Sequence, residues 1–237
     1  MPYLKFHPNY APPSHLRLIM ERKIDALDIL ATALRKSFDY ATFLRMLDHL
    51  VRNGETSGEN QSDELVKYTK LNASRVKRLT RTAIPSPSTV SLVKSLPFDM
   101  EWVVIAEAWC GDVAQNLPFI HNLAEAVPNV RLRMVFRDEN PQYMDQFLTN
   151  GARSIPKWVI YRKDTDEILG VWGPQPAVLR KMVLDMRGGT NPPSKESIAE
   201  EVHRWYHNDR NSELEKEIVE MFGKIAEEHG AEDELTR

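Results

Sequence analysis

The sequence of 237 residues has one cysteine, little net charge and no long apolar run. A single cysteine cannot form a disulfide within the chain, which favours a cytoplasmic location. No apolar stretch approaches the roughly 20 residues that a membrane-spanning helix needs. The first residues lack the basic and apolar blocks of a signal peptide. We therefore expect no membrane association.

The charge and the metal-binding residue types exclude further classes of function. The net charge is −3, which argues against general affinity for nucleic acid. The seven histidines are scattered, and no spacing in the sequence is typical of a metal site. No glycine-rich loop of the kind that binds phosphate is present. We expect no metal, no cofactor and no nucleic-acid partner.

The surroundings of the single cysteine are informative. The apolar run 102–108 ends in Trp109-Cys110-Gly111-Asp112-Val113, and the residues that follow have helical apolar spacing. Cys110 is therefore expected at the junction of a buried strand and a helix N-terminus. The free N–H groups and the backbone dipole at such a position favour a thiolate over a thiol. Cys110 is a candidate nucleophile, and a small packed residue is the competing interpretation.

Apolar periodicity predicts an α/β domain in the middle of the chain. The expected strands and helices are, in chain order, strand 78–82, helix 86–96, strand 102–108, helix 112–127, strand 130–136, helix 142–148, strands 157–161 and 168–172, and helix 177–186. Strands alternating with helices are typical of a sheet covered by helices.

Several motifs resemble the thioredoxin superfamily. Trp109-Cys110-Gly111 after a strand is similar to the family motif Trp-Cys-Gly-Pro-Cys, and Ser154-Ile155-Pro156 before a strand is similar to its cis-proline loop. Together with segments 137–141 and 172–174, these motifs resemble a group of bacterial thioredoxin-family proteins. The resemblance implies a thioredoxin-like fold, a mixed central sheet flanked by helices, with the cis-proline beside the cysteine. The predicted order of elements agrees with it.

The sequence departs from the family pattern at three positions. Val113 replaces the second cysteine, which would resolve a mixed disulfide. Asp112 replaces the proline, and its carboxylate would repel a thiolate. Val104 stands where the family has a buried acid. Asp112 is expected to accept hydrogen bonds at the helix N-terminus, and a role as proton acceptor for Cys110 is the alternative. Ordinary dithiol turnover is not expected.

Two functions remain open. The first is a thiol–disulfide oxidoreductase acting through Cys110 alone, on protein thiols, with glutathione or another small thiol resolving the product. The second is a non-catalytic module that holds a protein, either as an extended peptide beside Ile155 and Pro156 or on an apolar stripe of the tail. In both, the supporting residues are Trp109, Gly111, Asp112, Val113, Ile155 and Pro156. An iron–sulfur carrier like the single-cysteine glutaredoxins is disfavoured, because Val113 is not serine.

We divide the chain into an N-terminal helical extension (1–76), a thioredoxin-like domain (77–187) and a C-terminal helical tail (188–237). Basic residues of segment 64–82 are expected to form a solvated helix face that pairs with the acidic tail. Two apolar stripes of the tail must pack on the central domain, on the N-terminal helices or on another subunit, which leaves a homodimer open. They are Ile198, Val202, Trp205 and Tyr206, and Leu214, Ile218, Met221, Phe222 and Ile225.

Overall fold

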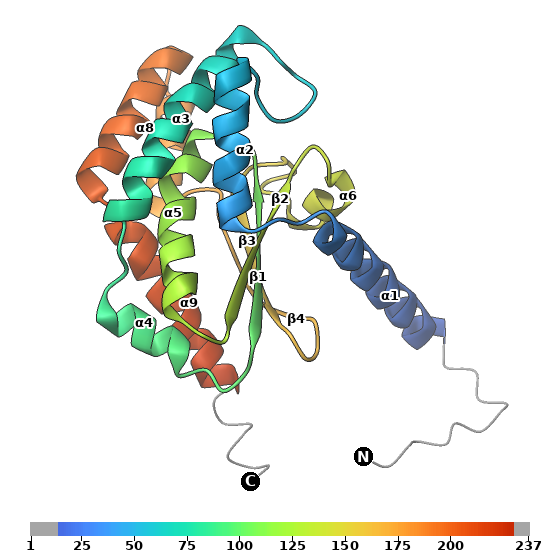
Figure 1. Ribbon diagram of the computed structural model, residues 1–237. Helices are drawn as coiled ribbons and strands as arrows, with labels where there is room; N and C mark the ends of the chain where they lie inside the picture. The colour runs from blue at the N-terminus through green and yellow to red at the C-terminus, as the bar shows by residue number, and fades with distance from the viewer. Residues whose placement is uncertain (1–13, 230–237) are drawn as a thin grey trace, which may run out of the picture.

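The computed structural model describes residues 14–229, with side chains described from residue 25 onward. Its centre is a mixed sheet of four strands in the order β2-β1-β3-β4 (Figure 1). β1 pairs parallel with β2 and antiparallel with β3, which pairs antiparallel with β4. The strands are β1 (Met100–Ala106), β2 (Val130–Phe136), β3 (Lys157–Arg162) and β4 (Glu167–Trp172). The predicted α/β class with a central mixed sheet is confirmed.

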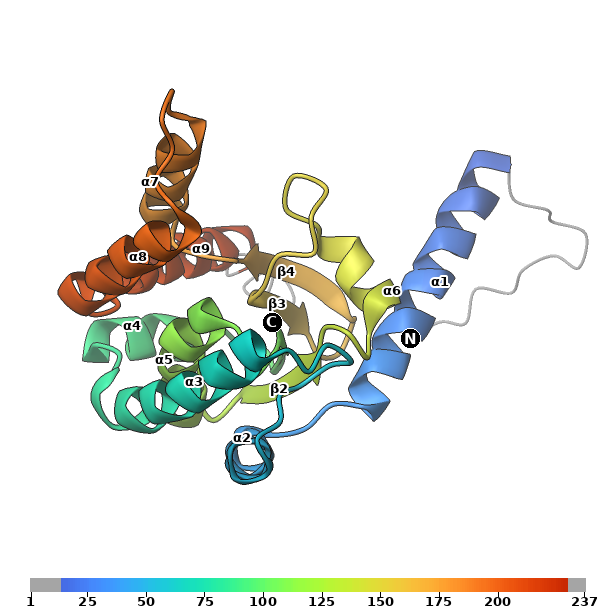
Figure 2. The same ribbon diagram turned by 90° about the horizontal axis from the view of Figure 1, so that it is seen from above.

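Helices cover both faces of this sheet. They are α1 (Ser14–Arg35), α2 (Tyr40–Asn53), α3 (Asp63–Thr82), α4 (Pro87–Lys94), α5 (Gly111–Ala126), α6 (Pro141–Met144), α7 (Ala177–Gly188), α8 (Lys195–Asp209) and α9 (Ser212–His229), with a short 3-10 turn, η1 (Asp145–Phe147). Figure 2 shows α5 and α9 on one face of the sheet and α6 and α1 on the other. Within the described part of the chain, no helix is both long and apolar enough to cross a membrane.

The predicted strand 78–82 is wrong, because these residues form the last turns of α3. The apolar spacing that begins earlier in α3 continues through Val76 and Leu79 to Ala83, and all three are buried. A spacing of three to four residues between apolar positions is helical, so residues 78–82 continue the helix that begins before them. No strand formed by residues 78–82 pairs with the edge strand β2. The residue that pairs with its outer edge is Phe38, which exchanges backbone hydrogen bonds of 3.0 and 2.9 Å with Met134.

The tail packs on the central domain, the first of the three predicted places. Phe222 of α9 lies against Trp102 of β1 and Trp158 of β3, with ring centroids 5.6 and 6.0 Å apart. Leu214, Ile218 and Ile225 of the same stripe are also buried. The second stripe, on α8, packs with α7 in a separate small cluster around Leu179, Val183, Ile198 and Tyr206. The tail therefore completes the core and adds a helix pair beside it.

Candidate functional site

The backbone places Cys110 where the sequence predicts it. β1 ends at Ala106, a short turn follows, and α5 begins at Gly111 with Cys110 as its N-cap residue. The carbonyl oxygen of Cys110 accepts the N–H of Ala114 at 3.2 Å, which is the first turn of the helix. The side chain of Cys110 makes no capping hydrogen bond. Cys110 therefore lies at the junction of β1 and the N-terminus of α5, as expected.

The thiol of Cys110 is sealed within the protein. The residue is 8% exposed, and its Sγ donates to the carbonyl oxygen of Ile155 at 3.4 Å. Burial is the main cause that raises the pKa of Cys110 to about 12, and the negative charge of Asp112 raises it further. The backbone N–H groups of Val113 and Asp112 and the charge of Arg137 lower this pKa, but by less. The lowered pKa expected at a helix N-terminus is therefore not found, because the loss of water outweighs the helix effect.

The loop beside the thiol is filled by residues of the same chain. The peptide bond between Ile155 and Pro156 is cis, and both residues are buried. The segment after β4 lies against this loop: a Cβ at Gly173 would collide with the carbonyl oxygen of Pro156, and the φ of Gly173 is +113°. Lys157 Nζ donates to the carbonyl oxygen of Gly173 at 3.2 Å. Gly173 therefore lies against the cis-proline, where the backbone continues the pairing of β3 and β4.

Asp112 joins the start of α5 to the C-terminal half of the chain. Its carboxylate accepts Gln175 Nε2 at 3.0 Å and the hydroxyl of Tyr206 at 2.8 Å. Asn116 Nδ2 donates to the same hydroxyl at 3.0 Å. Burial raises the pKa of Asp112, while the bonds from Gln175 and Tyr206 and the charge of Arg75 oppose the shift. The expected capping role is replaced by side-chain partners from the β4–α7 loop and α8.

A second set of contacts holds α3 and α8 near the turn that precedes Cys110. Asn72 Nδ2 donates to the carbonyl oxygen of Ala108 at 3.1 Å, and Arg75 donates to Asn72 Oδ1 at 3.1 Å. The guanidinium of Arg75 also bonds His203 Nε2 at 2.9 Å. These side chains connect two helices that are far apart in the sequence. Together with Tyr206, they hold α8 against the start of α5.

A buried acid lies three residues before Cys110. Glu107 is fully buried, and its carboxylate accepts the hydroxyl of Ser57 and the N–H of Asp138, the latter at 3.0 Å. The N–H of Ala108 donates to Ser57 Oγ at 2.8 Å. Burial is the main cause that raises the pKa of Glu107. This acid connects the loop between α2 and α3 to the turn between the inner strand β1 and α5.

Comparison with known proteins identifies the family to which the chain belongs. The model of a family described as thioredoxin matches residues 58–188 of the chain, which is more than half of it. This chain belongs to the thioredoxin family. No curated protein matches the sequence. The thioredoxin-like fold that the Trp-Cys-Gly and cis-proline motifs imply is therefore confirmed.

Two solved structures are similar to this thioredoxin-family chain. One is an HIV epitope scaffold, with a TM-score of 0.44 and 18% identity, covering 76% of this chain and 96% of its own. The other is a protein of unknown function from Pseudomonas aeruginosa, with a TM-score of 0.46 and 16% identity, covering 74% and 95%. Likenesses at this level say nothing about what the chain does.

The other residues expected around the thioredoxin-family cysteine have structural contacts. Val113 is buried at 1% exposure and packs in the core. Trp109 is half-buried, and the guanidinium of Arg137 lies 4.8 Å from its ring centroid. Arg137 also pairs with Asp138 at 2.7 Å. Gly111 is the first residue of α5, and a Cβ added to it would lie 3.8 Å from Nη1 of Arg75.

Several residues around the cysteine were not predicted, above all Gln175, Tyr206, Asn72 and Ser57. Tyr206 was assigned to an apolar stripe, and nothing near it in the sequence indicates that its hydroxyl bonds to a carboxylate 94 positions away. The one available signal is the pair Asp112 and Asn116, one helical turn apart at a helix start. Such a polar pair on a buried helix needs partners from elsewhere in the fold. Among the described residues, no group of histidine, cysteine and acids could hold a metal ion.

Proposed function

We propose that this thioredoxin-family protein is a non-catalytic, protein-binding module in which Cys110 is a packed structural residue. The observation that carries the proposal is the sealed thiol, at 8% exposure and with its pKa raised to about 12. At neutral pH such a group is a thiolate in roughly one molecule in 100,000. Thiol–disulfide exchange requires the thiolate, so Cys110 is a poor nucleophile in this arrangement.

Two further features support a role without thiol turnover. Val113 cannot resolve a mixed disulfide, and it is part of the core. The carbonyl oxygen of Ile155, which could otherwise pair with an extended peptide, accepts the thiol of Cys110 at 3.4 Å. A cytoplasmic location, expected from the single cysteine, belongs to this proposal.

The test is the pH dependence of Cys110 alkylation by iodoacetamide in the folded protein, followed by mass spectrometry. We expect slow alkylation with no midpoint below the ordinary thiol pKa of roughly 8.5. The matched control is the same chain unfolded in urea, in which Cys110 should react rapidly. Insulin reduction with dithiothreitol should not be accelerated.

A midpoint well below that of an ordinary thiol would contradict the proposal. It would instead support exchange through Cys110 alone, with glutathione or another small thiol as the resolving partner. The Cys110→Ser variant gives a second check, because a binding module keeps its partners without the sulfur. Loss of all partners in that variant, with the fold intact, would argue for the oxidoreductase.

A further inference from the structure

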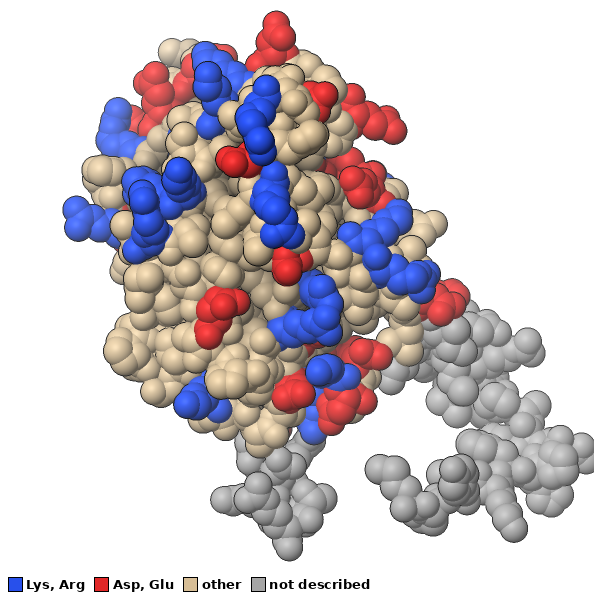
Figure 3. All heavy atoms as spheres, viewed as in Figure 1, with Lys and Arg blue, Asp and Glu red and all other residues tan. Residues whose placement is uncertain are grey.

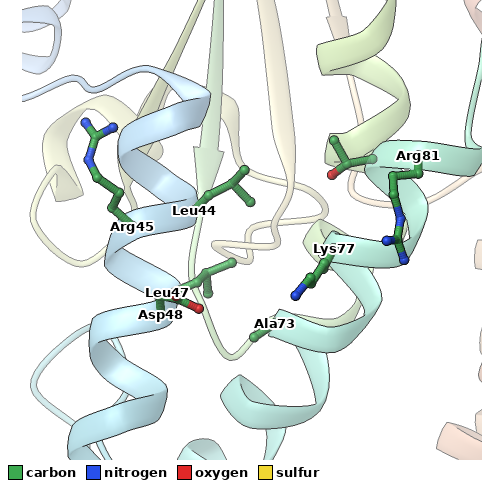
Figure 4. A pocket seen from close by; sticks show the side chains of 8 residues that line it. Leu44, Arg45, Leu47, Asp48, Ala73, Lys77 and Arg81 are labelled. Carbon is green, nitrogen blue, oxygen red and sulfur yellow. The ribbon is translucent and has the colours of Figure 1, made fainter.

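The groove between α2 and α3 has an apolar floor. It has a volume of about 400 Å³, and Figure 4 shows Leu44 and Leu47 projecting from α2 toward α3. Ala73 of α3 completes the floor, and its small side chain leaves the space open. The hydroxyl of Thr80 bonds Tyr40 and the carbonyl oxygen of Val76, both at 2.7 Å. The Thr80 hydroxyl therefore already has its hydrogen-bond partners, and the floor of the groove favours contact with apolar side chains.

The rim of the groove is cationic on the side of α3. Lys77 and Arg81 are exposed and line the groove, whereas Asp48 is the single acid among its lining residues. With Arg45, the lining has three cationic side chains and one acid, a balance of +2. Figure 3 shows Lys and Arg side chains gathered over the face where α2 and α3 lie. This charge favours a partner with acidic residues beside its apolar ones.

The acidic tail of the chain does not neutralise these cations in the described residues. α9 packs on α4 and β4. Glu215 accepts the N–H of Ser86 at 2.7 Å, and Glu217 accepts Trp172 Nε1 at 2.6 Å. Within residues 25–229, neither Lys77 nor Arg81 has an ion pair. The expected pairing of the basic face with the acidic tail is therefore wrong for α9, and the face is open to an acid from outside.

We propose that the α2–α3 groove binds an acidic amphipathic helix of a partner protein. A third helix can lie along two packed helices and place an apolar stripe between them, as in other helix-in-groove complexes. Two or three apolar side chains of the partner fill the groove above Leu44, Leu47 and Ala73. Acids flanking that stripe meet Lys77 and Arg81. This inference rests on the proposed binding function and names its surface and the chemistry of its partner.

The test uses the full chain and three labelled synthetic peptides of about 18 residues, long enough for about five helical turns. The first has leucine at i, i+3, i+4 and i+7 spacing with glutamate elsewhere, the second has lysine in place of glutamate, and the third has the first peptide's composition without the stripe. Fluorescence anisotropy should show the first peptide binding at least about tenfold more tightly than the other two.

Two variants locate the binding. Ala73→Phe fills the groove without changing charge, and K77E/R81E reverses the rim; each should weaken binding of the first peptide about tenfold or more. The matched control K94E/K224E makes the same change in charge outside the groove and should bind as the natural chain does. Thermal unfolding checks that each variant is folded.

Absence of binding by the first peptide would overturn the inference. So would equal binding of the lysine peptide, or binding that neither groove variant weakens. None of these results changes the alkylation of Cys110, on which the proposed function is tested. A reactive Cys110 would overturn that function whatever the peptides do, so the two failures are distinguishable.

Discussion

At residue scale, Cys110 shows two electrostatic effects in competition. The N–H groups at the start of α5 stabilise a thiolate, as its position predicts. A helix terminus contributes about 0.3 to 2 kcal/mol to a nearby charge, whereas an ion taken out of water loses several kcal/mol. Burial therefore decides the pKa. Tyr206 of α8 donates to Asp112, two residues after Cys110, and so holds α8 beside this position.

Tyr206 is the residue that we expect to control the position of α8 beside Cys110. Tyr206→Phe removes a hydrogen bond to half-buried Asp112 and one from Asn116. Asp112 keeps Gln175 as a partner, and Asn116 keeps the carbonyl oxygen of Asp112, so the cost is that of two lost hydrogen bonds. Urea unfolding should show a loss of about 1 to 3 kcal/mol. Cys110 should also alkylate faster, because α8 is held less firmly.

The control for this variant is Tyr68→Phe, because Tyr68 lines the same pocket as Asp112 and Tyr206 but its hydroxyl makes no hydrogen bond within residues 25–229. It should leave both stability and alkylation close to those of the natural chain. Unchanged stability and unchanged alkylation in Tyr206→Phe would show that these hydrogen bonds do not hold α8 in place.

At the scale of elements, α9 acts as part of the thioredoxin-like core. Its apolar stripe lies over the two tryptophans of the sheet, Trp102 and Trp158. Gly170 of β4 permits the close approach, because a Cβ there would lie 3.0 Å from Met221 Sδ. A helix that begins 40 residues after β4 thus covers the sheet next to it.

Phe222→Ala tests whether α9 is integral to the core. Phe222 is fully buried, and removing a buried phenyl ring costs about 3 to 5 kcal/mol. We expect a loss of this size in the free energy of unfolding measured in urea. Val219→Ala, on the exposed side of the same helix, should cost less than about 0.5 kcal/mol. Equal small effects would mean that α9 contributes little to the core.

For the whole molecule, the carboxyl groups of Glu107 and Asp112 contribute a fall in stability as the pH rises, whereas His121 and His203, whose pKa burial lowers, contribute in the opposite direction. Burial raises the pKa of Glu107 above its ordinary value of 4.5, and it raises the pKa of Asp112 as well. The folded protein therefore holds protons that the unfolded chain has released. Stability from these groups is present below the ordinary pKa and is lost as the pH rises through the raised folded value.

Glu107→Gln should reduce this dependence. Glutamine keeps an acceptor for the N–H of Asp138 and a polar group beside Ser57, but it cannot ionise. Urea unfolding from mildly acidic to neutral pH should show a smaller decline in stability than the natural chain shows. Glu227→Gln, at an exposed position, should leave the decline unchanged. A steeper decline in Glu107→Gln would contradict the raised pKa of Glu107.

Much of the fold and part of the site could be predicted from local patterns. The strand before Trp109, the helix after Cys110 and the hairpin of β3 and β4 follow from apolar spacing and turn residues, which act over a few positions. The strand predicted at 78–82 failed because five residues are too few to fix a period, while Leu79 and Ala83 continue a helix that began well before them.

The sequence by itself determined the class of fold, the place of Cys110 at a helix start and the lack of a resolving cysteine, because each depends on residues close together in the chain. Only the tertiary structure decided that the thiol is sealed, that Asp112 binds Tyr206 and Gln175, and that the α2–α3 groove stays open. Burial and long-range hydrogen bonds depend on which segments meet in space, and the pKa of Cys110 follows the water that those segments exclude.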